Sequence, residues 1–201
     1  MSQAHWDSVY TANDLDELGW YEPRASTLEL VTAYSTPADS LIDVGGGASP
    51  LAVELAELGY RDLTVLDISE RALEASRTAL REHAEVVTWI RADVTRFGPD
   101  RRWQLWHDRA VFHFLVEQDD REAYRAVAAS AVEPGGVLIV ATFAPEGPDK
   151  CAGLSVRRYD VATLAAEFAP DFDLIEGRRL IPIAAAGDQR PYVGAVLRRV
   201  G

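Results

Sequence analysis

The sequence predicts an α/β protein, and three observations support this fold class. Strand and helix patterns alternate from residue 40 to about residue 143, which is the signature of a parallel sheet with crossover helices. A glycine-rich loop directly follows the first apolar strand pattern. Two strand patterns close the chain, and a terminal hairpin of this kind requires an antiparallel strand. The expected architecture is therefore a Rossmann-like, doubly wound sheet of seven strands, mostly parallel with an antiparallel C-terminal hairpin strand, and with helices on both faces.

Each element has its own signal. Short runs of apolar residues predict strands at 41–44, 63–67, 86–92, 103–107, 137–143, 172–181 and 192–199. Helical spacing predicts crossover and C-terminal helices at 48–58, 69–81, 119–132 and 160–168. Asp160 is the expected N-cap of the last helix, and Glu133-Pro134-Gly135-Gly136 stops the helix before it. The small residues of the loop 184–190, including Ala184 to Ala186 and Gly187, leave room for a substrate.

One domain is expected for the whole chain, residues 1–201. That length is enough to bury a substantial core, and the sequence contains no repeat, low-complexity stretch or linker. Residues 40–201 form the expected core. Residues 1–35 precede the first strand and are expected to form a helical lid segment of two helices, the second running from about Pro23 to Ala33.

Composition excludes several classes of protein. Lys and Arg count 20 and Asp and Glu count 32, so the formal charge is 20 − 32 = −12. This balance disfavours nucleic acid as a partner, because no basic surplus offsets the phosphates. The single cysteine, Cys151, rules out an internal disulfide and fits a reducing compartment. No signal peptide or membrane span is expected, so we expect a cytoplasmic protein, either monomer or homodimer, without a membrane partner.

The loop after the first strand, Asp43-Val44-Gly45-Gly46-Gly47-Ala48-Ser49, carries the most chemical information. Its glycines let the backbone turn tightly and let a ligand approach the amides at the start of the next helix. A carboxylate at Asp43 would repel a pyrophosphate. It would attract S-adenosylmethionine (SAM), which carries an ammonium and a sulfonium. The loop therefore favours SAM over a dinucleotide.

Three more acids stand at the ends of later strands. Asp67 lies 20 residues after Gly47, where a carboxylate can accept hydrogen bonds from both ribose hydroxyls. Asp93 closes the third strand and is placed to accept the adenine amine, and Asp108 closes the fourth. A strand-end Asp can also simply cap the next helix. Four such residues in order, the first with a glycine loop, favour a cofactor site.

These motifs resemble the class I SAM-dependent methyltransferase family. The loop from Asp43 matches its acid-x-Gly-x-Gly-x-Gly pattern with Ser49 in place of the third Gly. Residues 40–145 carry the resemblance, and the terminal hairpin fits the family topology. The resemblance implies SAM as cofactor and a set of cofactor-binding residues: Asp43, Gly45, Gly46, Gly47, Asp67, Ile68, Asp93, Val94 and Asp108.

Within that family, the sequence is similar to the elongation-factor lysine methyltransferases and, near the N-terminus, to the thiopurine and tellurite methyltransferases. Asp108-Arg109-Ala110 resembles an Asp-Lys-Gly stretch of the lysine enzymes, which usually have an Asp where this chain has His113. An acid would steer an ammonium, whereas a histidine could deprotonate a thiol, phenol or imidazole. His113 is the candidate catalytic base, with packing between Phe112 and Phe114 as the alternative. His107, inside the strand pattern, is expected to be structural.

The candidate substrate-binding residues are Trp20, Tyr21, Arg109 and His113. Trp20 and Tyr21 stand in a loop before a helix and suit a lid over the cofactor or substrate, whereas Trp6 and Tyr10 are expected to pack in the core. Cys151 follows the fifth strand without a neighbouring base, which argues against a catalytic thiol. Four histidines and one cysteine show no metal-ligand spacing.

The leading hypothesis is an enzyme, a SAM-dependent methyltransferase acting by in-line displacement on the sulfur, nitrogen or oxygen of a small molecule. The alternative is a protein lysine N-methyltransferase. An NAD(P)-dependent oxidoreductase fits less well, because Pro50 stands where that glycine pattern needs a Gly. A non-catalytic SAM-binding protein stays open, because cofactor residues do not prove chemistry.

Overall fold

A seven-stranded sheet forms the centre of the protein in the computed structural model, which describes every residue except 1, 15–16, 19, 183–186 and 188. The strand order is β3-β2-β1-β4-β5-β9-β8. All neighbours from β3 to β5 pair in parallel, and β9 pairs antiparallel with both β5 and β8. The strands of this sheet are β1 Leu41–Val44, β2 Leu63–Asp67, β3 Val87–Arg91, β4 Trp103–Arg109, β5 Val132–Phe143, β8 Phe172–Leu180 and β9 Tyr192–Arg199.

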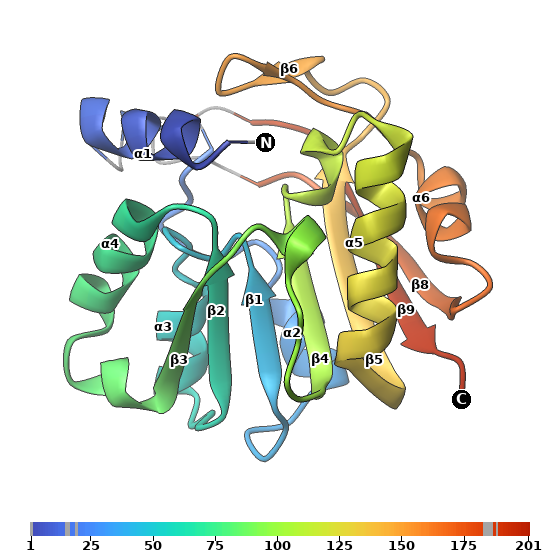
Figure 1. The fold of residues 1–201 in the computed structure, drawn as a ribbon, viewed down its shortest axis with the longest axis horizontal. Helices are drawn as coiled ribbons and strands as arrows, with labels where there is room; N and C mark the ends of the chain where they lie inside the picture. Colours follow the sequence, from blue (N-terminus) through green and yellow to red (C-terminus); the bar gives the residue numbers. More distant parts are fainter. Residues whose placement is uncertain (1, 15–16, 19, 183–186, 188) are drawn as a thin grey trace.

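Helices cover both faces of the sheet (Figure 1). The described α-helices are α1 Gln3–Ala12, α2 Leu28–Tyr34, α3 Leu51–Glu57, α4 Glu70–Leu80, α5 Gln118–Ala131 and α6 Val161–Phe168. Short 3₁₀ turns occur at η2 Arg81–Val86, η3 Val94–Arg96 and η4 Phe112–Phe114. The side chains of α2, α3 and α4 share one buried cluster with alternate strand residues such as Leu41, while α5 and α6 share the other with residues such as Ile42. This alternation follows from the period of two along a strand.

The predicted fold class is confirmed, and most predicted elements lie within a few residues of their observed bounds. Asp160 caps α6 as expected, with a capping box that includes Thr163. Two features were missed: β4 runs on to Arg109, and a small hairpin, β6 Lys150–Cys151 with β7 Leu154–Ser155, follows β5. The predicted opening at Ala184 to Ala186 lies outside the described residues.

Helix α2 starts at Leu28, five residues after the predicted start. Two carboxylates bind the backbone of the chain before it. Glu54 accepts a hydrogen bond from the backbone N–H of Ala25 at 3.0 Å, and Glu22 accepts one from the backbone N–H of Ser26 at 2.9 Å. These acceptors satisfy donors that would otherwise favour an earlier helix start. One of them lies 29 positions away in sequence, so local sequence reasoning could not identify it.

The parallel strands end at one edge of the sheet, and helix α1 and the β6–β7 hairpin lie beyond that edge (Figure 1). Strand β1 lies between β2 and β4, so successive crossovers diverge at its end. Ligands of open α/β sheets bind at such a switch point, at the carboxyl ends of the strands. The fold therefore directs attention to the space between β1, β2, β4 and α1.

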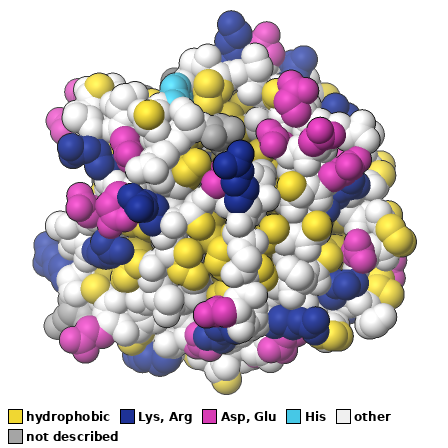
Figure 2. Space-filling model, in the orientation of Figure 1, with side chains coloured by type: hydrophobic (Ala, Val, Ile, Leu, Met, Phe, Trp, Pro, Cys, Tyr) yellow, Lys and Arg dark blue, Asp and Glu magenta, His cyan; other side chains and the backbone are white. Residues whose placement is uncertain are grey.

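The surface gives no sign of a polyanion-binding face on the side in view. Figure 2 shows acidic and basic side chains interspersed on that side of the molecule. In the part of the chain that the structure describes, no helix is both long and apolar enough to cross a membrane.

Candidate active site

A cavity lies where the fold predicts a ligand, at the carboxyl ends of β1, β2, β3 and β4. The space between its lining residues, counted together with the opening to solvent, is about 960 Å³. Its walls combine residues after the strands with residues from the N-terminal segment. The lining includes Trp6, Tyr10, Trp20, Tyr21, Asp43, Gly45, Gly46, Asp67, Ile68, Asp93, Val94, His107, Arg109, Phe114 and Cys151.

The glycine loop after β1 is shaped so that no side chain fits on it. Gly45 has a φ of +70°, a conformation that favours glycine. A Cβ on Gly46 would lie 2.2 Å from Oδ2 of Asp43, and one on Gly47 would lie 2.7 Å from Oδ2 of Asp67. The loop therefore brings bare backbone close to two carboxylates. Gly45 and Gly46 line the cavity, whereas Gly47 stands behind them and donates its N–H to Asp67 at 3.1 Å.

Asp67 ends β2 with a carboxylate that is buried yet faces the cavity. Its Oδ1 accepts from the backbone N–H of Ser69 at 2.8 Å, and its Oδ2 accepts from that of Gly47. Burial raises the pKa of Asp67 to about 6, the Ser69 and Gly47 amides oppose that shift, and the nearby charge of Asp43 adds to it. Each oxygen keeps a lone pair for a further donor, as a ribose diol requires.

Asp43 and His107 face each other across neighbouring strands. The two residues are register partners on β1 and β4, so their side chains project from the same face of the sheet. Nδ1 of His107 lies 2.7 Å from Oδ1 of Asp43, and its Nε2 lies 2.9 Å from Oγ1 of Thr27. All three residues are buried. Sequence reasoning treated His107 as structural and did not single out Thr27, although strand alignment would have pointed to the pair.

Asp93 and Val94 lie at the end of β3, on the cavity wall that also includes Ile68. Oδ1 of Asp93 accepts from the backbone N–H and the hydroxyl of Thr95 at 3.0 and 2.7 Å. The residue therefore caps the η3 turn and also reaches the cavity. The capping and the ligand interpretations of this acid are compatible.

Asp108 lies away from the cavity, contrary to its assignment as a cofactor-binding residue. It is fully buried, and its oxygens accept from the backbone N–H groups of Val111 and Phe112 and from the hydroxyl of Tyr124 on α5. Neighbouring residues of a strand face opposite sides of the sheet, so Asp108 points toward α5 whereas His107 points toward the cavity. Burial, first of all, raises the pKa of Asp108 to about 6. Its role is to fix the turn after β4.

His113 also lies outside the cavity lining, which does not support its assignment as base or substrate ligand. Its ring is fully buried against Phe114 and Phe143, with centroids 4.4 and 4.7 Å away, and neither ring nitrogen has a partner among the described residues. Burial lowers the pKa of His113 to about 3, and the nearby Arg109 contributes to the same shift. The ring is therefore neutral at ordinary pH and packs as an aromatic residue.

Arg109 is a predicted substrate residue that does reach the cavity, but it is held by the N-terminal segment. Its guanidinium lies 3.2 Å from Glu22 in an ion pair that is largely buried, and it donates to the backbone carbonyl of Trp20 at 3.2 Å. It also lies over the ring of Tyr192, 5.9 Å from the centroid. Arg109 thus fastens the segment that carries Trp20 to the end of β4.

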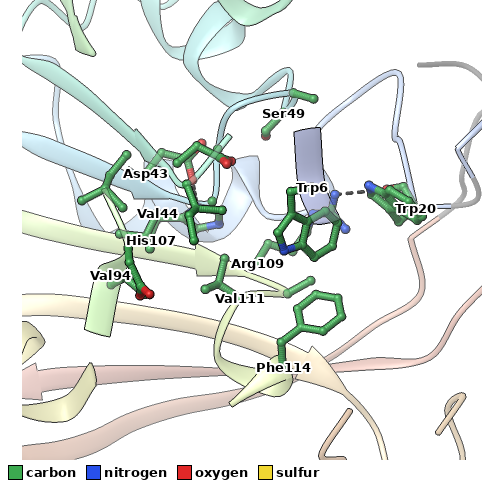
Figure 3. A pocket seen from close by; sticks show the side chains of 18 of the residues that line it. Trp6, Trp20, Asp43, Val44, Ser49, Val94, His107, Arg109, Val111 and Phe114 are labelled. Carbon is green, nitrogen blue, oxygen red and sulfur yellow. Dashed lines mark hydrogen bonds and ion pairs between the residues drawn. The ribbon is translucent and has the colours of Figure 1, made fainter. Parts of the chain in front are cut away.

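Aromatic side chains form the outer wall of the cavity. Figure 3 shows Trp6, Trp20 and Phe114 on one side, with Asp43 and His107 on the other. The Trp6 ring lies 5.2 Å from Phe114 and 6.2 Å from Trp20, centroid to centroid. Tyr21 also lines the cavity, and so do Trp6 and Tyr10, which were expected in the core. Their helical spacing on α1 was the available signal.

Helix α1 is held over the site by the ring contacts of Trp6 and by a hydrogen bond of Asp7. It has no fully buried residue. Asp7 accepts from the hydroxyl of Ser69, the N-cap of α4, at 2.7 Å. Ser69 also donates its backbone N–H to Asp67. Through this contact, the N-terminal segment reaches a residue that is hydrogen-bonded to the candidate ribose acid.

The described residues supply neither a catalytic thiolate nor a metal site. Cys151 lines the cavity, but its buried thiol has a raised pKa, owing chiefly to burial, and therefore stays protonated. Among the residues that the structure describes, no group of three His, Cys, Asp or Glu side chains is arranged to hold a metal ion.

The carboxylates of the site are acceptors that suit a ligand with a sugar diol at one end and an ammonium nearby. Asp67 offers acceptors for a diol, and Oδ2 of Asp43 is buried without a partner among the described residues. The glycine loop between them carries no side chains, so a ligand has room to approach its backbone. A pyrophosphate in the same place would meet two carboxylates. SAM has the groups that these residues could bind.

Comparison with known families supports this chemistry. Residues 41–136, just under half of the chain, match the family described as "Methyltransferase domain". A curated relative, the eEF1A lysine and N-terminal methyltransferase of Mus musculus, is 23% identical over 140 residues, which is 69% of this chain and 20% of the relative. The Danio rerio protein of that name is 26% identical over 155 residues, 75% of this chain and 22% of the relative. The chain thus spans about a fifth of the length of these relatives.

Solved structures share the fold over nearly the whole chain. The 1,6-didemethyltoxoflavin-N1-methyltransferase of Burkholderia thailandensis superposes with a TM-score of 0.74 at 19% identity, covering 99% of this chain and 84% of that one. A structure from work on the conversion of a disulfide bond into a thioacetal group during echinomycin biosynthesis gives 0.76 at 19% identity, covering 98% and 93%. At such identities the likeness establishes the fold.

Proposed function

We propose, from the premise that this chain is a class I SAM-dependent methyltransferase, that it transfers a methyl group from SAM to a small-molecule nucleophile. The observation that carries the proposal is the aromatic wall of Trp6, Trp20 and Phe114, which closes the cavity on the side away from Asp43. A largely apolar acceptor site bounded by aromatic rings suits a compact molecule. SAM supplies an activated methyl group on its sulfonium.

The residues of the chain bind and orient the reactants. Asp67 would accept hydrogen bonds from the ribose hydroxyls. Asp93 and Val94 would flank the adenine, and Asp43 would face the ammonium. These contacts fix the methyl donor so that the acceptor can approach in line, and such positioning is the main contribution that methyl transfer needs. The aromatic wall excludes water from the acceptor.

A dedicated base is absent from the described part of the acceptor side. The titratable side chains that line that side are Tyr10, Tyr21, Arg109 and Cys151. Arg109 is held by Glu22, and burial raises the pKa of Tyr10 and of Cys151, so that both stay protonated. His107 is committed to Asp43 and Thr27. The acceptor must therefore arrive neutral or anionic with a free lone pair, as an unprotonated amine, an imidazole or a thiolate does. An acceptor that carries a proton must therefore lose it to solvent before it reacts.

The second candidate is a protein lysine or N-terminal amine methyltransferase. It is favoured by the curated relatives, which are named for that activity on eEF1A. A protein acceptor would have to pass Trp6 and Trp20, and it would require the N-terminal segment to move aside.

The test is a turnover screen that reads release of S-adenosylhomocysteine (SAH) with panels of thiols, amines, phenols and imidazoles beside eEF1A and its N-terminal peptide. We expect turnover with at least one small-molecule class and none with the protein or peptide. Turnover rates should rise with pH for acidic acceptors, because only the deprotonated fraction reacts. Turnover confined to the protein arm would replace the proposal with the second candidate.

A further inference from the structure

The buried chain Asp43–His107–Thr27 combines features that a purely structural contact does not need. His107 lies within hydrogen-bond distance of both partners, at 2.7 and 2.9 Å, and Asp43 and His107 both line the cavity. Only one oxygen of Asp43 is used. The other, Oδ2, is buried with no partner in the described residues. A buried carboxylate oxygen without a donor is costly, and this one belongs to a residue that lines the cavity, where a ligand can supply the donor.

The direction of the hydrogen bond between His107 and Asp43 follows from the chemistry of the groups. An ionised carboxylate can only accept, so Nδ1 of His107 carries a proton and donates to Oδ1 of Asp43. Nε2 of His107 lies 2.9 Å from the Thr27 hydroxyl, a group that can either donate to it or accept from it. Thr27 precedes α2 and belongs to the chain that leads from Trp20 and Glu22. The imidazole therefore joins the end of β1 to the N-terminal segment.

The free oxygen has a defined surrounding. A Cβ on Gly46 would fall 2.2 Å from it, so Oδ2 lies against the bare backbone of the glycine loop. Asp43 cannot rotate away without losing its bond to His107. The carboxylate is thus presented to the glycine loop in a fixed orientation.

We infer that His107 is a positioning residue that holds Asp43 so that Oδ2 receives the ammonium of SAM, and that Thr27 extends this control to the N-terminal segment. The inference rests on the proposed function only in taking SAM as the ligand of the cavity. It assigns His107 to the binding of the amino-acid end and gives it no part in proton transfer. The adenosine end is bound elsewhere, by Asp67 and Asp93.

Two ligands separate this role from general support of the fold. SAH contains the ammonium, whereas 5′-methylthioadenosine retains the adenosine and the thioether and lacks the amino-acid end. In calorimetric titrations, His107→Gln is expected to weaken SAH by about tenfold or more, the range for hydrogen bonds to charged groups. Its affinity for 5′-methylthioadenosine should stay within about twofold of the native protein. A purely structural residue would weaken both ligands alike.

Thr27 supplies the matched variants, which also serve if His107→Gln fails to fold. Thr27→Val removes the hydroxyl at nearly constant shape and should weaken SAH about fivefold, a typical worth of one neutral hydrogen bond, without affecting 5′-methylthioadenosine. Thr27→Ser keeps the hydroxyl and should bind both ligands as the native protein does.

A double-mutant cycle tests whether His107 acts through Asp43. In an Asp43→Asn background, His107→Gln should add little further loss of SAH affinity, because the oriented carboxylate is already gone. Equal losses for both ligands in the single variants, or unchanged SAH affinity, would overturn the inference. A native protein that binds SAH yet methylates no acceptor would instead overturn the proposed function and leave this inference standing.

Discussion

Replacing Asp67 by Asn is expected to weaken SAH binding at pH 7.5 by about 1.5–3 kcal/mol, the cost of losing hydrogen bonds to a charged acceptor. Asp67 is the one carboxylate of the site that both lines the cavity and is fixed by two backbone amides, those of Gly47 and Ser69. The amide of Asn retains one acceptor oxygen and presents an NH₂ group to the other ribose hydroxyl. The loss should therefore be similar for SAH and for 5′-methylthioadenosine, in contrast to the His107 variants.

The same residue gives the site a pH dependence whose sign can be worked out. Burial raises the pKa of Asp67 to about 6, and ribose hydroxyls bind the ionised form. SAH affinity should therefore be constant above about pH 7 and fall below pH 6, approaching tenfold per pH unit. Asp67→Asn should remove most of this slope. Calorimetry from pH 7.5 to 5 measures it, and an Asp67→Asn protein with native affinity and slope would show that the ribose assignment is wrong.

For the stability of the unliganded protein the sign is opposite. The folded pKa of Asp67 lies above its ordinary value of 3.8, so the folded state holds the proton more tightly than the unfolded chain does. The contribution of Asp67 to stability is greatest below pH 3.8 and is lost as pH rises through 6. The ribose hydroxyls of a bound ligand offset that cost at neutral pH.

Replacing Arg109 by Met is expected to lower the free energy of unfolding by about 3–5 kcal/mol, because it leaves the buried carboxylate of Glu22 without its partner. The side chains of Arg109 and Glu22 are 13% and 3% exposed, and their charged atoms lie 3.2 Å apart. Adding Glu22→Gln to the variant should recover a large part of the loss, since the uncompensated charge is then absent. Chemical denaturation measures all three proteins.

An exposed ion pair of the same type serves as the control. Arg101 binds Asp62 through two hydrogen bonds of 2.9 and 2.7 Å, with both side chains more than two-fifths exposed. Arg101→Met should cost no more than about 1 kcal/mol. If Arg109→Met is as mild as Arg101→Met, the N-terminal segment is not fastened to β4 by this pair.

The sequence was sufficient for the sheet and for placing Asp43, Asp67 and Asp93 at one edge of it. A short apolar strand, an acid and three glycines leave few alternatives for the chain around Asp43, and the spacing to Asp67 follows from the length of one crossover. Both features depend on residues near one another in the chain. The predicted placement of Asp43, Asp67 and Asp93 at one edge of the sheet agrees with the cavity lining.

Side-chain direction was the harder part. Asp108 and His107 are neighbours on β4, and a shift of one residue along a strand exchanges the faces. The sequence pattern located the end of this strand two residues too early, so the assignment selected Asp108 where the structure presents His107 to the cavity. Register with β1 decides the question, and register is a property of two distant segments.

The N-terminal segment was expected to cover the site, but the polar contacts that hold it could not be predicted. Asp7 contacts Ser69, 62 residues away in the sequence. Glu22 contacts Arg109, 87 residues away, and Thr27 contacts His107, 80 residues away. No local pattern encodes such contacts. They explain why Trp6 and Tyr10 line the cavity although their spacing is also that of core residues.

The central claim, that this cavity binds SAM through Asp43 and Asp67, is tested most directly by calorimetric titration of the native protein with SAH and with NAD. We expect saturable heat for SAH at one site per chain and none for NAD, because two carboxylates face the position that a pyrophosphate would occupy. Saturable binding of NAD without binding of SAH would contradict it.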